Sequence, residues 1–224
     1  MNLPIRSWFD KVMVQLDLGG SFPKRILFWG EGIGGIASYM AGWMAGNGME
    51  VIVLDGANRF DPYMVSSFAR KALILPERLL KRILIARAFT CYQMATLIER
   101  LTSFGGGIRE TSLRKPYVLL LGPITPFLDE DVSEREIWPL FERTLKRIGE
   151  IGRQGISFFL FQPSVSFRFS SPKGRVGRGV ESRERALMKK LFRFSDLVWK
   201  ISLEGEELQI ESEILPPSLA PWTL

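Results

Sequence analysis

Short apolar runs alternate along the chain with longer segments in which apolar residues recur at helical spacing. Five runs are apolar almost throughout, as expected of strands buried on both faces of a parallel sheet, and they span residues 25–29, 50–55, 82–86, 116–121 and 156–161. Helical patterns lie between them, in the stretch that ends near Gly46 and over residues 62–75, 92–102 and 133–152. The last of these begins with a Ser133-x-x-Glu136 capping box. This alternation predicts an α/β fold, with a mainly parallel sheet covered by helices on both faces.

The end of the chain has a different pattern. Residues 196–203 and 206–212 alternate apolar and polar side chains around a Gly turn, which predicts a C-terminal antiparallel hairpin at the sheet edge. The 224 residues contain no internal repeat, so we predict one domain over residues 1–224. A short lead-in at residues 1–20 and a tail at 213–224 would flank its core.

The composition limits the kinds of functional site that the chain can form and the cellular location that we expect for it. The chain has no histidine, one cysteine (Cys91) and a net charge of +6. These counts exclude a Ser-His-Asp triad, a Cys–His pair, a His-ligated zinc and an intrachain disulfide. The start has no signal-peptide pattern, and the uncharged stretch 32–49 is too rich in glycine for a membrane span. We therefore expect a cytoplasmic protein that has no metal and no membrane partner, with Cys91 as a core residue.

A glycine-rich segment follows the first strand, where a phosphate-binding loop would lie. It reads Gly30-Glu-Gly-Ile-Gly-Gly-Ile-Ala37, and Gly30-x4-Gly35 matches the first part of the motif G-x-x-x-x-G-K-[ST]. The lysine and hydroxyl positions of that motif are Ile36 and Ala37, which supply neither the phosphate-binding charge nor the magnesium ligand. The glycines fit either weak anion binding by backbone amides or tight packing of the strand against the helix.

Four segments make the chain resemble the ATPase core of the RecA/RadA recombinase superfamily, closest to the archaeal RadA and eukaryotic recombinase branch and its paralogues. They are Leu18–Gly20 with residues 25–35, residues 51–55 with 58–62, residues 83–89 with Gln93, and residues 159–162 ending in Gln162. The resemblance covers most of residues 15–212 and implies a RecA-like P-loop core. The N-terminal helical DNA-binding domain of that family has no counterpart here.

The resemblance also implies which functional positions have lost their chemistry. Gly122 stands where the family has its magnesium-associated aspartate, and Ala57, two residues beyond Asp55, stands where it has its water-activating glutamate. With Ile36 and Ala37, four positions that would act together in ATP hydrolysis lack the side chains that this reaction needs. We therefore predict a pseudo-ATPase with no catalytic residues and no cofactor.

Only the degenerate loop, at Gly30, Glu31, Gly35, Ile36 and Ala37, marks the former nucleotide site. Ile36 would fill the vacated phosphate pocket and make the fold stable without nucleotide. Asp55 would be a relic that hydrogen-bonds the backbone, and the acidic residues 129–131 would favour a helix N-terminus.

A basic stretch suggests a nucleic-acid contact. Residues 168–193 contain nine Lys/Arg against two Glu, and the first half also contains aromatic residues and glycines. Such a loop can follow a phosphate backbone while an aromatic ring stacks on a base. The candidate DNA-binding residues are Phe167, Arg168, Phe169, Lys173, Arg175 and Arg178. A solvated loop that leads into a charged helix remains the alternative.

Together these features predict an accessory protein of DNA recombination or repair. It would bind single-stranded DNA through the basic loop, dock a RecA/RadA-family recombinase or another repair protein, or do both; its oligomeric state is left open. One alternative is a protein-only regulatory module with a RecA-like fold. Another is a slow atypical NTPase, for which Arg87 and Gln162 would be the remaining polar groups.

Overall fold

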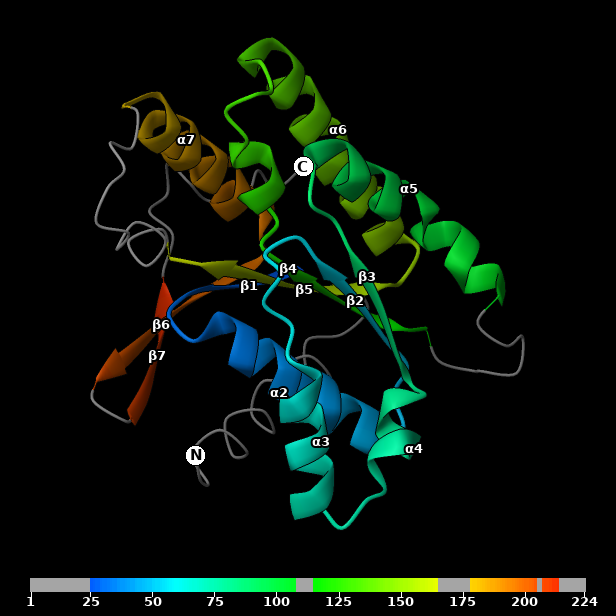
Figure 1. The fold of residues 1–224 in the computed structure, drawn as a ribbon. Coiled ribbons are helices and arrows are strands. Elements are labelled where there is room, and N and C mark those ends of the chain that lie inside the picture. Colours follow the sequence, from blue (N-terminus) through cyan, green and yellow to red (C-terminus); the bar gives the residue numbers. More distant parts are fainter. Residues whose placement is uncertain (1–24, 108–114, 165–177, 205–206, 214–224) are drawn as a thin grey trace.

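The computed structural model describes residues 25–107, 115–164, 178–204 and 207–213 (Figure 1). The strands are β1 Arg25–Gly30, β2 Val51–Asp55, β3 Ile83–Arg87, β4 Tyr117–Leu121, β5 Ser157–Pro163, β6 Leu197–Glu204 and β7 Glu207–Glu213. The helices are α2 Ile33–Gly46, α3 Pro62–Lys71, α4 Pro76–Leu80, α5 Cys91–Gly107, α6 Glu134–Arg153 and α7 Arg178–Phe194, with a short 3-10 helix, η1, at Thr125–Leu128. Among these residues, none of the helices combines the length and the apolar character that a bilayer crossing needs.

The strands form one sheet in the order β3-β2-β4-β5-β1-β6-β7. The first six are mutually parallel, and β7 pairs antiparallel with β6. The first strand therefore lies inside the sheet, between β5 and β6. The predicted α/β class with a mainly parallel sheet is confirmed.

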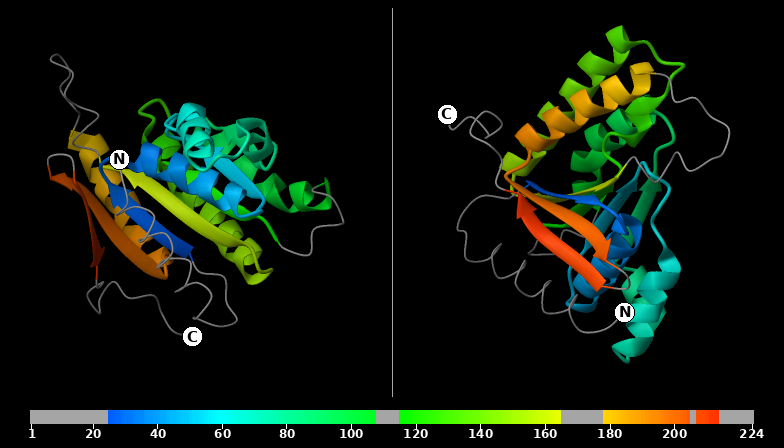
Figure 2. Two further views of the ribbon diagram at one scale, coloured as in Figure 1. Left: turned by 90° about the horizontal axis from the view of Figure 1, so that it is seen from below. Right: turned by 90° about the vertical axis from the view of Figure 1, so that its left-hand side faces the viewer.

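Helices cover both faces of the sheet (Figures 1 and 2). On one face, α2, α3 and α4 bury side chains such as Met40, Val65 and Leu79 against the sheet. On the other face, α5, α6 and α7 do the same with side chains such as Ile98 and Phe141. Each inner strand therefore alternates between two cores, which explains why its sequence is apolar throughout.

The helix predicted over residues 62–75 is confirmed only over its first 10 residues, which form α3 Pro62–Lys71. α3 begins after Asp61, whose carboxylate accepts a hydrogen bond from the Tyr63 amide at 2.8 Å. It ends at Lys71, because Leu73 adopts a left-handed backbone with φ of 57°. The amide of Ile74 then donates to the carbonyl of Ala69 at 2.9 Å, which closes the helix end. A second, one-turn helix, α4, leads into β3.

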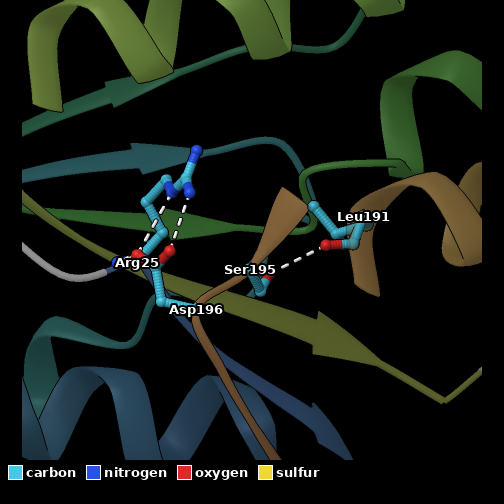
Figure 3. Close-up of polar contacts among 4 residues, drawn as sticks. All are labelled: Arg25, Leu191, Ser195 and Asp196. Atoms are coloured by element: carbon cyan, nitrogen blue, oxygen red, sulfur yellow. Dashed lines mark hydrogen bonds and ion pairs between the residues drawn. The ribbon is translucent and has the colours of Figure 1, made fainter. Parts of the chain in front are cut away.

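An arginine clamp joins the start of β1 to the start of β6 (Figure 3). The Arg25 side chain donates to both carboxylate oxygens of Asp196, at 3.2 Å and 2.7 Å. The Arg25 amide also donates to this carboxylate, and the Asp196 amide donates to the Arg25 carbonyl. The guanidinium also lies 4.3 Å from the centre of the Phe194 ring. Next to it, the Ser195 hydroxyl donates to the Leu191 carbonyl at 2.8 Å and closes the end of α7. These contacts fix β6 beside β1.

Candidate functional site

The candidate site lies at the carboxyl ends of the parallel strands. The chain leaves β1 towards α2 on one face, whereas the helix after β5, α7, lies on the opposite face. Because β1 and β5 are neighbours, their carboxyl ends form the position at which open α/β sheets bind ligands. The predicted glycine loop and Gln162 both lie there.

The glycine loop is shorter than the sequence predicts. Helix α2 begins at Ile33, so only Glu31 and Gly32 separate it from β1, and Gly35, Ile36 and Ala37 belong to the helix. The predicted loop, which extended to Ala37, is wrong in this respect. The physical reason is the buried helical face that starts at Ile33 and continues through Ile36 and Ala37. A two-residue connection leaves little backbone with which to surround a phosphate.

Close packing occupies the backbone of this connection. The Glu31 amide donates to the Ile201 carbonyl at 3.0 Å, and the Gly30 carbonyl accepts from the Ser164 amide at 2.8 Å. A Cβ atom at Gly30 would lie 1.9 Å from the Ile201 carbonyl oxygen, and the φ of Gly30 is 129°. Of the two roles left open for the glycines, Gly30 serves tight packing of the loop against β6.

The residues at the lysine and hydroxyl positions of the phosphate-loop motif, Ile36 and Ala37, are parts of the core. Ile36 is 2% exposed and belongs to the cluster between α2 and the sheet, together with Phe28 and Phe161. Ala37 is completely buried in the same cluster. Both side chains therefore contribute to the apolar core of the α2 face.

Gly122 and Ala57, the two positions at which the resemblance leads one to expect carboxylates, are packed against each other. A Cβ atom at Gly122 would lie 2.7 Å from the Cβ of Ala57 and 2.7 Å from the Thr125 hydroxyl oxygen. The φ of Gly122 is 63°, a conformation that residues with a Cβ adopt only with strain. The space that a metal-binding aspartate would need at position 122 is thus filled by Ala57 and Thr125.

Asp55 and Arg87 form a structural pair at the ends of β2 and β3. The Asp55 carboxylate is buried and accepts hydrogen bonds from the amides of Arg59, at 3.1 Å, and Phe60, at 3.0 Å. The Arg87 Nε lies 3.6 Å from the same carboxylate. The structure therefore supports the prediction that the Asp55 carboxylate accepts hydrogen bonds from the backbone. The same carboxylate also forms an ion pair with Arg87.

Gln162 joins the end of β5 to the loop that follows β4. It is buried, its Oε1 accepts from the Ile124 amide at 3.2 Å, and its Nε2 donates to the Pro163 carbonyl at 3.1 Å. Both residues named for a slow NTPase, Arg87 and Gln162, thus take part in bonds that stabilise the carboxyl edge.

The basic stretch divides into two parts. Phe167, Arg168, Phe169, Lys173 and Arg175 lie outside the described residues, and Arg178 is the first residue of α7. In the second part, Arg183 donates to the Asp129 carbonyl at 2.6 Å and approaches Glu134 of α6 at 3.7 Å. Lys190 likewise pairs with Glu142 of α6 and lies 5.7 Å from the centre of the Trp138 ring. Some of the positive charge counted from the sequence therefore attaches α7 to α6.

The start of α6 carries a polar network that the sequence predicts only in part. Ser133 precedes the helix as expected, but its hydroxyl donates to the Glu136 carboxylate at 2.9 Å and does not cap a backbone amide. The Tyr92 hydroxyl donates to the same carboxylate at 2.5 Å. This hydrogen bond raises the pKa of Tyr92 to about 12 and lowers the pKa of Glu136. Across the described segments, no group of acidic residues and cysteine is arranged to hold a metal ion.

Cys91 is buried at the start of α5, as predicted. Burial raises the pKa of its thiol. The thiol is therefore a poor nucleophile at neutral pH.

A feature that the sequence reasoning missed is an exposed apolar surface at the β3 edge of the sheet. Leu84 and Ile85 of β3 are 45% and 36% exposed, although the strand reads as a buried one. The sequence carries no signal of this exposure, because the apolar residues nearby have ordinary spacing: Leu73 and Leu75 are two positions apart, and Ile85 and Phe89 are four apart.

No protein-family model matches the chain, and a search of curated proteins found none with significant sequence similarity.

Proposed function

We propose that this protein is a RecA-like core that no longer hydrolyses ATP and acts as an accessory factor in DNA recombination or repair. The observation that carries the proposal is the packed carboxyl edge of the sheet. Gly30 touches β6, Ala57 closes the space at Gly122, and the lysine position is a core isoleucine. Phosphoryl transfer needs a charged cradle and a metal ligand at these points, so a site filled in this way favours a binding role.

If the proposal is right, ATP neither stabilises the protein nor is hydrolysed by it. A ligand that binds only the folded state raises the melting temperature by an amount that grows with the logarithm of its concentration relative to its Kd. Thermal melts with and without Mg-ATP should therefore coincide, and phosphate release should stay at the background rate. A shift of several degrees, or turnover that disappears in an Arg87→Ala variant, would instead support the slow NTPase.

The DNA part of the proposal rests on the composition of the basic loop. Phosphate contacts by lysine and arginine make affinity fall steeply with salt. Fluorescence anisotropy of a labelled single-stranded oligonucleotide at two salt concentrations should show such binding without nucleotide. A variant with Arg168, Lys173, Arg175 and Arg178 changed to alanine should lose it.

The matched control removes the same charge from another surface. Arg100, Arg135, Lys146 and Arg153 are exposed residues of α5 and α6, and changing all four to alanine gives the same net charge as the loop variant. Binding that falls equally in both variants would reflect net charge alone. Binding that is absent from folded wild-type protein would end the DNA role.

A second candidate function is a protein-only docking module with the same fold. The observation that favours it is the apolar surface at the β3 edge, because large exposed apolar areas in soluble proteins mark interaction sites. In this role the protein would show no salt-dependent DNA affinity, and substitutions on the β3 edge would abolish partner binding.

A further inference from the structure

The turn between α3 and α4 carries the most exposed large hydrophobic side chain among the described residues. Leu73 is 95% exposed, and Leu75, two positions later, is 59% exposed. Ile74 lies between them, is partly buried and packs against the apolar cluster of the α2 face. The turn projects from one end of the molecule, away from the sheet (Figures 1 and 2). We name residues 70–81 the α3–α4 tip.

The backbone of the tip directs Leu73 into solvent. The Leu73 amide donates to the Arg70 carbonyl at 3.2 Å, and the Ile74 amide donates to the Ala69 carbonyl at 2.9 Å. These two bonds form a Schellman motif, in which the position of Leu73 has a left-handed backbone and is usually glycine. The φ of Leu73 is 57°, so this leucine is strained. The fold thus holds an apolar side chain in water at a position where glycine would be more stable.

Positive charge surrounds the two exposed leucines. Residues 70–81 contain four cations and one acidic residue, Glu77, which gives the tip a net charge of +3. All four cations are exposed, and within the described part of the chain none of them forms an ion pair; they are Arg70, Lys71, Arg78 and Lys81. Two of them precede the leucines and two follow, so the cations flank the apolar side chains from both sides.

This combination matches the surface of an anionic lipid bilayer. Apolar side chains enter the boundary between the headgroups and the acyl chains, and nearby lysines and arginines attract anionic headgroups. Insertion also removes Leu73 and Leu75 from water, which is the favourable term that the tip lacks in solution. A bilayer is fluid, so it accepts a projecting turn without a pocket of matching shape.

We propose that the α3–α4 tip docks the protein reversibly on anionic lipid bilayers, with Leu73 and Leu75 inserted among the headgroups and the four cations against lipid phosphates. This role goes beyond the functions proposed above and depends on neither of them. The expectation of no membrane partner came from the lack of a spanning segment, whereas the tip would contact only the bilayer surface. Because the tip inserts two leucines and carries few charges, its binding is weak and sensitive to salt.

Two other occupants fit less well. A specific protein interface usually buries about 800 Å² on each partner, and two leucines on a projecting turn supply only a small part of that area. Single-stranded nucleic acid would match the charge, but its bases bind by stacking on aromatic rings. Residues 70–81 contain no aromatic residue.

The first test uses the full-length protein and vesicles of two compositions. Vesicles of phosphatidylcholine that also contain phosphatidylglycerol should sediment the protein at low salt, and vesicles of phosphatidylcholine alone should not. A higher salt concentration should release the bound protein, because it screens the charge of the headgroups. No binding to the anionic vesicles, or equal binding to both kinds of vesicle, would overturn the inference.

A fluorescent label identifies the surface that enters the bilayer. The chain has one cysteine, Cys91, and it is buried, so a Leu73→Cys variant can be labelled at position 73 with an environment-sensitive fluorophore. The emission of this label should shift to the blue on anionic vesicles. The control is a Tyr63→Cys variant, because Tyr63 is 80% exposed but lies at the other end of α3. A shift at position 63 without one at position 73 would show that a different surface binds and that the tip does not.

Two variants separate the apolar contribution from the charge. Leu73→Gly relieves the strained backbone, so it should fold normally and lose about tenfold in affinity for the anionic vesicles. Lys71→Glu combined with Lys81→Glu should weaken binding by at least about tenfold. The matched control, Arg135→Glu combined with Lys146→Glu, changes the net charge equally at exposed positions of α6 and should still bind. Thermal melts establish that each variant is folded. Unchanged affinity in both tip variants, or an equal loss in the control, would contradict the proposal.

The outcome is separable from that of the proposed DNA role. The variant with alanine at Arg168, Lys173, Arg175 and Arg178 should keep its affinity for anionic vesicles, and Leu73→Gly should keep the affinity of the wild type for single-stranded DNA. If the double Glu variant of the tip loses DNA and keeps the vesicles, the tip is a nucleic-acid surface and the lipid assignment is wrong. If vesicle binding holds while wild-type protein binds no DNA, the lipid role stands alone.

Discussion

Replacing Gly122 with alanine tests whether the carboxyl edge of the sheet is closed by packing. The new Cβ would lie 2.7 Å from both the Ala57 Cβ and the Thr125 hydroxyl oxygen, and 2.9 Å from the Ala57 amide nitrogen. The left-handed backbone costs about 1–2 kcal/mol for a residue with a Cβ. Overpacking of a tight site adds about 1–3 kcal/mol. We therefore expect Gly122→Ala to lower the free energy of unfolding by about 2–5 kcal/mol.

Urea denaturation followed by circular dichroism measures this change directly. In a chain of this size, 1 kcal/mol corresponds to about 2–4 °C, so the melting temperature should fall by roughly 4–20 °C. A loss below about 1 kcal/mol would refute the reasoning, because it would mean that the edge relaxes to accept a side chain.

A double-mutant cycle with Ala57→Gly separates the two contributions. Removing the Ala57 Cβ relieves the side-chain contact but leaves the backbone conformation and the Ala57 amide contact unchanged. The double variant should recover only part of the loss, with a coupling of about 0.5–3 kcal/mol. Gly122→Asp should then be at least as destabilising as Gly122→Ala, because its Cβ meets the same atoms.

Three further predictions concern the polar contacts. Asp55→Ala leaves the amides of Arg59 and Phe60 without their acceptor and should cost about 2–4 kcal/mol in urea unfolding; a loss below about 1 kcal/mol would show that other groups replace the carboxylate. Asp196→Ala removes a partly exposed arginine clamp and should cost about 1–2 kcal/mol, which an unchanged denaturation midpoint would contradict. Because the pKa of Tyr92 is raised to about 12, its bond to Glu136 stabilises the fold below pH 10, and this contribution disappears as the pH rises through 12. The pKa of Glu136 is lowered from its usual value of 4.5, so the contribution of the same bond is complete above pH 4.5 and is lost as the pH falls through the lowered pKa. A Tyr92→Phe variant should lack the alkaline part of this pH dependence of stability, which thermal melts between pH 9 and 12.5 would measure.

The sequence predicts the inner strands well, because burial on both faces requires apolar side chains throughout. The predicted runs at residues 50–55 and 116–121 differ from β2 and β4 by one residue at the start. The position of a strand within the sheet is a different matter. β3 reads Ile-Leu-Ile-Ala-Arg like an inner strand, yet it is an edge, because strand order depends on pairings between distant segments.

At the candidate site, too, the residue types could be predicted from the sequence, whereas features that depend on tertiary contacts could not. The prediction that Ile36, Ala37, Ala57 and Gly122 supply no phosphate-binding or metal-binding group needs only the sequence, since residue type alone decides it. The length of the β1–α2 connection is not, because the helix start depends on how Ile33 packs against the sheet. The attachment of Arg183 and Lys190 to α6 likewise requires two helices to meet in space, so a charge count along the chain overstates the charge available to a ligand.

The location of β1 has a consequence for how the protein reaches its native state. The strand pairs with β5 and β6, and the contact between Arg25 and Asp196 joins residues 171 positions apart in sequence. Loops of this length must close before the centre of the sheet can form, so we expect slow folding with late consolidation of β1. Until then Leu27 and Phe28 remain uncovered, which makes the folding intermediate, rather than the finished structure, the state most prone to aggregation.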